Sequence, residues 1–242
     1  MNMEGTFGYI VTPRAMDRDG HISPKILLQE LALVSTCRNR NEGAMKIYLR
    51  RQLGAVWMFR RVDLRQFSPI QLGDRLEGFA SSRTLNDTEY ILRSTFVRDG
   101  EVVAQMDAAI MAVLVKERKK LPCSAVEPLF NVAPLEEVPV FPRLPMRSDV
   151  DYCHEKTITE KDCDENAQHF ASHNYADLVC RESGYWDGEY HMLKRLQLDY
   201  VKECLVGDTI HLGCVASGEG FTVQGIHENG KPCFNAYIEY ER

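Results

Sequence analysis

The sequence predicts an α+β protein made of two copies of one unit, each a curved antiparallel sheet wrapped around a central helix. Three observations predict this fold class. Prolines gather in the middle of the 242-residue chain, short motifs repeat on either side of them, and each side carries one apolar helix pattern followed by four strand-like runs.

The middle of the chain is rich in proline. Six of the ten prolines lie between residues 121 and 147, and proline disfavours both helix interiors and central strands. We therefore expect a linker over 119–149 that sustains neither. It would separate an N-terminal unit, residues 1–118, from a C-terminal unit, residues 150–242.

The two units repeat at a shift of 134 residues. Met58–Leu64 aligns with Met192–Leu198, and Gly73–Asp74 aligns with Gly207–Asp208, without a gap between them. Such a constant shift indicates duplication of one structural unit.

Each unit opens with an acidic turn, at 17–21 and at 162–169, followed by a candidate helix. Ser23 and Pro24 are a suitable N-cap and first helical residue. Ser172 is the candidate N-cap of the second, shorter helix, and Gly184 its candidate end. The first helix is apolar around most of its girth, hence buried, through these residues: Ile26, Leu27, Leu28, Leu31, Ala32 and Leu33.

Four runs with strand character follow each helix. Asp99-Gly100 and Asn229-Gly230 separate the last two runs of each unit, and both pairs are typical of hairpin turns. A curved sheet around one buried helix is a hotdog fold, so the chain is expected to be a double hotdog. The expected strands cover roughly 55–67, 75–84, 88–98 and 101–115, then 190–201, 208–217, 220–228 and 231–240.

The composition is that of a soluble globular protein, with 44% hydrophobic residues, 26% charged residues and a formal charge of −6. Ala108–Val115 is the longest apolar run, too short to span a membrane, and the N-terminus does not read as a signal peptide. The eight cysteines form no C-x-x-C pair. We therefore expect a cytoplasmic protein with no metal and no other cofactor.

The charge is distributed unevenly. Residues 1–121 carry 19 basic and 14 acidic residues, whereas residues 122–242 carry 10 and 21. The basic residues either form solvated faces or dock an acidic partner, and nucleic acid is not an expected partner. They cluster at Arg38, Arg40, Lys46, Arg50, Arg51, Arg60, Arg61 and Arg65, and at 116–120.

The densest polar group lies in the second unit, at 162–169, and is followed by Tyr175 and by 200–208. Carboxylates, an amide and an imidazole at the mouth of a buried helix suit acyl transfer. At the shift of 134, Glu203 and Cys204 align with Pro69 and Ile70, so we expect one site per chain.

These residues resemble the acyl-ACP thioesterases of plants and bacteria, and the resemblance extends over most of the chain. The family carries a D-x-D-x-N-x-H-V-N-N-x-x-Y stretch and, further on, a Y-x-x-E-C segment. First-unit landmarks also agree, from Gly54–Trp57 through Pro69 to Gly73–Asp74. The matching residues of the two motifs are Asp162, Asp164, Asn166, His169 and Tyr175, then Tyr200, Glu203 and Cys204.

The resemblance implies a hydrolase of fatty acyl thioesters of acyl carrier protein. Asp164 and Asn166 would orient the site, His169 would act on the thioester or the water, and Glu203 would activate the water. Family mechanisms have also made the cysteine at 204 a nucleophile, but its acidic neighbour opposes ionisation, so we favour water and a packing role for Cys204.

The substrate would contact Tyr175 and the segment Trp57, Met58 and Phe59, for which core packing is the alternative. The acidic carrier would dock on the basic first unit. Chain length, the choice between carrier protein and coenzyme A, and monomer or homodimer stay open.

Two departures from the family pattern leave alternatives. One extra residue precedes His169, so Gln168 could fill its slot, and Ala171-Ser172 replaces the family's Asn pair. The spacing Asp164-x-Asn166-x-x-His169 also resembles (R)-specific enoyl-CoA hydratases, although that function would not use Glu203. A non-enzymatic protein that binds acyl chains or the carrier is the third reading.

Overall fold

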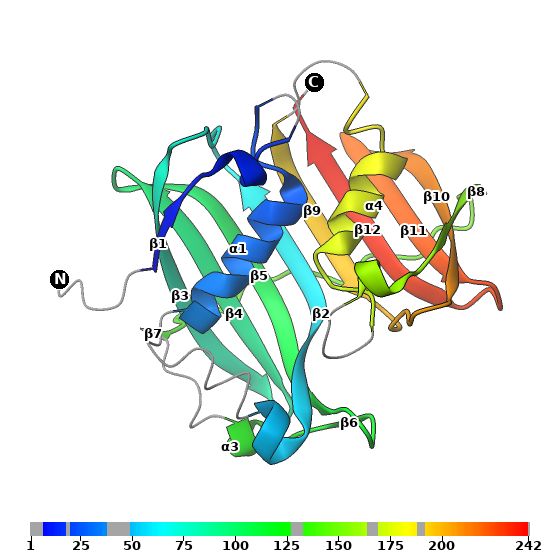
Figure 1. The fold of residues 1–242 in the computed structure, drawn as a ribbon, viewed down its shortest axis with the longest axis horizontal. Helices are drawn as coiled ribbons and strands as arrows, with labels where there is room; N and C mark the ends of the chain where they lie inside the picture. The colour runs from blue at the N-terminus through cyan, green and yellow to red at the C-terminus, as the bar shows by residue number, and fades with distance from the viewer. Residues whose placement is uncertain are drawn as a thin grey trace.

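The structure is a computed structural model, and it describes residues 7–17, 20–37, 49–126, 133–163, 169–187 and 192–241. Its strands form one continuous sheet with the order β1-β3-β4-β5-β2-β9-β12-β11-β10-β8. Figure 1 shows both longer helices, α1 and α4, on the same face of this sheet.

Both units contain the predicted helix followed by four antiparallel strands, and each has one further strand before the helix. The first unit comprises β1 (Phe7–Ile10), α1 (Pro24–Cys37), β2 (Ala55–Gln66), β3 (Arg75–Asn86), β4 (Glu89–Arg98) and β5 (Glu101–Leu114). The second comprises β8 (Tyr152–Thr157), α4 (Asn174–Glu182), β9 (Leu193–Tyr200), β10 (Thr209–Ser217), β11 (Gly220–His227) and β12 (Pro232–Tyr240). The predicted double hotdog is confirmed.

The two sheets join through antiparallel pairing of β2 with β9. In this pairing Asp63 lies opposite Gln197, and the register runs from Arg61 opposite Asp199 to Arg65 opposite Arg195. Asp63 and Gln197 are also equivalent at the shift of 134, because 63 + 134 = 197. The two halves are therefore related by a pseudo-twofold axis that passes through this residue pair.

The repeat is visible in single hydrogen bonds. Oδ2 of Asp74 accepts from the backbone nitrogen of Gln71 at 2.8 Å, and Oδ2 of Asp208 accepts from that of Leu205 at 2.8 Å. The glycine before each aspartate has a positive φ, 87° and 92°, which favours glycine at both turns. The same turn thus leads into β3 and into β10.

Helix α1 packs against β3, β4 and β5 and holds the core of the first unit. It begins at Pro24, as predicted, and Leu27, Leu31 and Val34 are fully buried. A Cβ on Gly78 of β3 would lie 2.9 Å from Cγ2 of Val34, so the close approach of helix and sheet requires glycine there.

Helix α4 begins later than predicted. Its N-cap is His173 rather than Ser172, whose carbonyl instead accepts a hydrogen bond from the Tyr200 hydroxyl at 3.0 Å. Gly184, with φ 73°, follows the C-cap Ser183, and this predicted end is confirmed.

Both predicted hairpins are present, with different turns. Asp99 and Gly100 both have positive φ, as a two-residue turn requires. In the second unit the backbone nitrogen of His227 donates to Lys231, which closes a longer turn in which Gly230 has φ 75°.

The proline-rich segment is less irregular than expected. It contains the short strands β6 (Lys119–Lys120) and β7 (Ala133–Pro134) and one helical turn, α3 (Cys123–Val126). The prediction of no helix was wrong at α3 because Pro122 precedes the turn rather than interrupting it.

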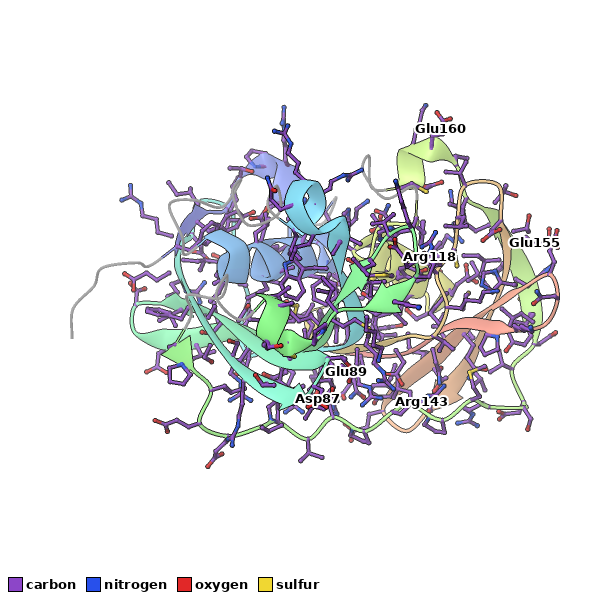
Figure 2. The ribbon with its side chains drawn as sticks, turned by 90° about the horizontal axis from the view of Figure 1, so that it is seen from below. Asp87, Glu89, Arg118, Arg143, Glu155 and Glu160 are labelled. Atoms are coloured by element: carbon purple, nitrogen blue, oxygen red, sulfur yellow. The ribbon has the colours of Figure 1, made fainter. Side chains whose placement is uncertain are left out.

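Residues 135–149 run along the face of the sheet opposite the helices, as Figure 2 shows from below. Arg61 donates to the carbonyl of Phe141 at 2.8 Å, Oδ2 of Asp199 accepts from the backbone nitrogen of Leu144 at 2.7 Å, and Asn235 donates to Pro145 at 2.7 Å. Polar side chains of the sheet thus satisfy the backbone of this segment. The segment crosses the junction between β2 and β9.

We predict that Asp199→Ala destabilises the protein by about 2–4 kcal/mol, because Asp199 is 4% exposed and its loss leaves Nε of Arg61 and the Leu144 amide without their partner. Urea unfolding at pH 7 measures the loss. Asp149→Ala breaks the exposed pair with Arg147 and should cause no measurable loss. Equal unfolding midpoints for both variants would contradict this role of Asp199.

Candidate functional site

The candidate site is built from three segments that the fold brings together. They are the described parts of the loop before α4 (158–163 and 169–173), the segment between β9 and β10 (201–208) and the turn after β5 (115–118). Residues 164–168 lie outside the described residues, and with them Asp164, Asn166 and Gln168.

His169 pairs with the segment that carries Glu203. It forms an isolated antiparallel bridge with Leu205, and the backbone nitrogen of Phe170 donates to the carbonyl of Cys204 at 2.8 Å. His169 therefore lies opposite a residue two positions after Glu203. The backbone around His169 thus meets the segment that carries Glu203, while the catalytic roles of both residues stay predictions.

Asp162 anchors the loop that precedes α4. Its Oδ2 accepts from the Thr159 backbone at 2.9 Å and from Lys156 at 2.9 Å, while its carbonyl accepts from the side chain of Asn174 at 2.8 Å. Burial raises the pKa of Asp162, but Lys156 and Thr159 outweigh it and leave this pKa below its usual value. Cys163, the next residue, forms an isolated antiparallel bridge with Phe170.

Glu203 is held by the first half of the molecule. Nη1 of Arg118, from the turn after β5, donates to Oε2 of Glu203 at 2.5 Å. Arg118, labelled in Figure 2, lies where the two halves meet. The Glu203 side chain is 24% exposed, so the carboxylate remains within reach of solvent.

Cys204 is fully buried beside Cys233 and Tyr175. Hydrogen bonding from Cys233 lowers the pKa of Cys204, burial opposes this, and Tyr175 adds to the lowering against the charges of Asp208 and Glu203. The sequence argument counted the acidic neighbour and missed the two donors. Because the thiol is enclosed, its position supports packing over attack on a substrate carbonyl.

Tyr175 lies in the core of the second unit. It is 3% exposed and makes edge-to-face contacts with the rings of Phe170, Tyr200 and Phe234, with centroids 4.6, 5.2 and 5.2 Å away. Burial raises its pKa well above the usual value. A contact between Tyr175 and substrate stays a prediction.

Trp57, Met58 and Phe59 are partly buried residues of β2. Trp57 contacts Tyr90 edge to face at 6.2 Å, and Phe59 lies 6.4 Å from Tyr200 of the second unit. Trp57 and Phe59 pack against the apolar core, whereas Met58 lies between them on the strand and faces the other side of the sheet. Their contact with substrate also stays a prediction.

Several arginines of the basic cluster bind carboxylates within the molecule. Arg60 pairs with Glu89, Arg61 pairs with Asp199, and Arg65 pairs with Asp63. Arg38, Arg40 and Lys46 lie outside the described residues. Residues 116–120, in the turn after β5 and in β6, are all exposed, although Arg118 pairs with Glu203 and Lys120 with Glu89.

Sequence reasoning missed His227 and Cys233. With Cys204 they form a buried group whose donor atoms lie within 4.8 Å of one another. Their separation along the chain matches no metal-binding motif, so only a comparison of the two units could have revealed them.

No family model matches the sequence, and no curated protein matches it. Solved structures are similar over nearly the whole chain. An acyl-ACP thioesterase from Bacteroides thetaiotaomicron aligns with a TM-score of 0.80 at 15% identity, covering 98% of this chain and 97% of that one. A 12:0-ACP thioesterase from Umbellularia californica aligns at 0.78 and 16%, covering 98% and 96%.

A more distant likeness is HtdX from Mycobacterium tuberculosis, with a TM-score of 0.61 and 12% identity over 97% of this chain and 98% of that one. At these identities the comparisons establish the double hotdog fold. Among the described residues, no helix is long and apolar enough to cross a membrane.

We predict that Asp162→Asn lowers stability at neutral pH by up to about 1 kcal/mol, because the amide cannot pair with Lys156. The pKa of Asp162 is depressed in the folded state, so this stabilisation is present above the unfolded pKa and is lost as pH falls through the folded one. The difference between wild type and variant should therefore shrink with acidification.

Urea unfolding between about pH 7 and pH 3 measures that difference, with exposed Asp151→Asn as the matched control. A gap between wild type and Asp162→Asn that stayed constant with pH would refute the assignment.

Proposed function

We propose that this protein hydrolyses fatty acyl thioesters of acyl carrier protein, releasing the free fatty acid. The observation that carries the proposal is the backbone pairing of His169 and Phe170 with the segment that carries Glu203, in a fold shared with acyl-ACP thioesterases. This function requires a carrier protein in the same compartment, so we expect the protein in the cytoplasm.

Glu203 acts as the general base in the proposed reaction. Its carboxylate takes a proton from water, and the water oxygen bonds to the thioester carbonyl carbon. Arg118 binds Oε2, which leaves Oε1 without a partner among the described residues and able to receive that proton. Collapse of the tetrahedral intermediate breaks the carbon–sulfur bond and releases the acid.

His169 stabilises the oxyanion or supplies the proton that the departing thiolate takes up. Asp164 and Asn166 orient His169 and the water, as the family resemblance implies. Cys204 packs beneath the Glu203 segment, consistent with its complete burial. Trp57, Met58 and Phe59 line the acyl chain's path, and Tyr175 supports the pocket from the core.

The exposed basic turn 116–120 is the proposed docking surface for the acidic carrier. Lys116 and Lys119 are exposed there, and Arg118 of the same turn reaches Glu203. A carrier bound at this turn would deliver its prosthetic arm close to the candidate base. Opposite charge would mainly raise the rate of association.

We predict that His169→Ala and Glu203→Gln each lower kcat by about 10²–10⁴-fold, the usual contribution of a positioned acid or base. Thiol release from acyl-ACPs of several chain lengths, beside matched acyl-CoAs, measures this and identifies the preferred substrate. The Cys204→Ala variant should keep most of the wild-type turnover. If Cys204 were the nucleophile, this variant would lose its turnover.

A wild-type protein that binds acyl-ACP but releases no thiol from any substrate would overturn the hydrolase. Hydration of a 2-enoyl thioester would then be assayed before a purely binding role is accepted.

We predict that Lys116→Glu with Lys119→Glu raises the KM for acyl-ACP about tenfold at low salt, with kcat and the KM for acyl-CoA little changed. Arg143→Glu, which puts a charge reversal of the same kind at one residue on the opposite face of the sheet, is the control (Figure 2). An unchanged KM for acyl-ACP would exclude this turn as the docking surface.

A further inference from the structure

We propose that Cys204, His227 and Cys233 form a zinc-binding site. Their two Sγ atoms and a ring nitrogen of His227 lie within 4.8 Å of one another, and all three residues are buried. They come from different places in the second unit: the segment between β9 and β10, the end of β11 and the start of β12. The proposal is independent of the thioesterase reaction and can be tested without turnover.

The imidazole of His227 is arranged as a metal ligand commonly is. The residue is 7% exposed, and its buried Nε2 has no hydrogen-bond partner. Nδ1 lies 3.9 Å from Oδ2 of Asp208, so a small rotation of the ring on metal binding would close the hydrogen bond by which carboxylates orient metal-binding histidines. An unpaired buried nitrogen is unfavourable unless a ligand occupies it.

The first unit serves as an internal control, because the same fold there uses apolar residues. Ile70 is the equivalent of Cys204 at the shift of 134. Residues 67 and 201 are equivalent at the same shift. The backbone nitrogen of residue 67 donates to the carbonyl of Val103, and that of residue 201 donates to the carbonyl of Cys233, so Val103 is the equivalent of Cys233. Ile70 and Val103 are both buried, so the fold needs no thiol at either position.

The third position differs in the same way. Arg98, the last residue of β4, binds Asp74, the equivalent of Asp208. In the second unit, His227 is the last residue of β11 and faces Asp208 where the first unit has Arg98. All three positions that carry metal-ligand residues in the second unit carry other residue types in the first. Packing demands of the hotdog therefore do not explain the set.

Two thiolates and an imidazole are the donors that zinc prefers. Binding would release the two thiol protons, and two thiolates balance the charge of Zn²⁺. Donor atoms in a tetrahedral site lie about 3.5–3.8 Å apart, so small side-chain rotations would close the group around the ion. Three protein ligands leave one position for water.

A disulfide between Cys204 and Cys233 is the competing use of these thiols. It would leave Nε2 of His227 without a partner, whereas a cation uses all three donors. We therefore favour the cation. Its binding would fasten the segment that carries Glu203 to the hairpin between β11 and β12.

Titration of the reduced full-length protein with Zn²⁺ and Co²⁺ under anaerobic conditions tests the proposal. We expect one zinc per chain, and with Co²⁺ a thiolate charge-transfer band and intense visible bands of a tetrahedral ion. Cys233→Val and His227→Gln should each weaken zinc binding at least 100-fold, and Asp208→Asn should weaken it 10–100-fold.

Cys233→Val installs the residue of the first unit and is chosen so that the variant folds. Cys214→Val, at a half-buried cysteine of β10, is the matched control and should bind zinc as wild type does. The proposal is overturned if the reduced wild type takes up no stoichiometric zinc, if Cys233→Val binds it unchanged, or if the thiols give only a disulfide.

Discussion

The antiparallel pairing of β2 with β9 is the constraint on which the rest of the molecule depends. It converts two five-stranded sheets into one and removes the edge that each would otherwise expose. Ion pairs cross the join on both sides of its centre, from Arg61 to Asp199 and from Arg195 to Asp63. The register of this pair also decides which residues of one half meet the other.

The pairing of β2 with β9 also determines which elements cover each face of the sheet. On one face α1 and α4 lie side by side, linked by the pair of Lys25 with Asp177. On the other face the segment 135–149 covers the carboxylates and amides of the sheet. These polar side chains are therefore buried, although they would be exposed on a sheet face that met solvent. The proline-rich segment, which the sequence predicted as a linker, is thus packed against the sheet.

The fold was largely predictable because its signals are local. Alternating residues, the turns at Asp99-Gly100 and Asn229-Gly230, and the repeated Gly-Asp turn each act over a few residues. The site was predictable only in part. The family resemblance named His169 and Glu203, but no sequence pattern pointed to Arg118, which reaches Glu203 across 85 residues. Such contacts depend on tertiary register, which no local pattern records. The sequence also placed the N-cap of α4 one residue early, at Ser172 rather than His173.

Covalent duplication has a further consequence for how this chain can change. In a dimer of identical single hotdogs, every substitution occurs twice, and any gain at one copy is tied to its effect at the other. Here Ile70 and Cys204 occupy equivalent positions and were free to diverge. Each mutation changes one half only. One half can therefore specialise in chemistry and the other in recognition, because a substitution in one leaves the sequence of the other unchanged.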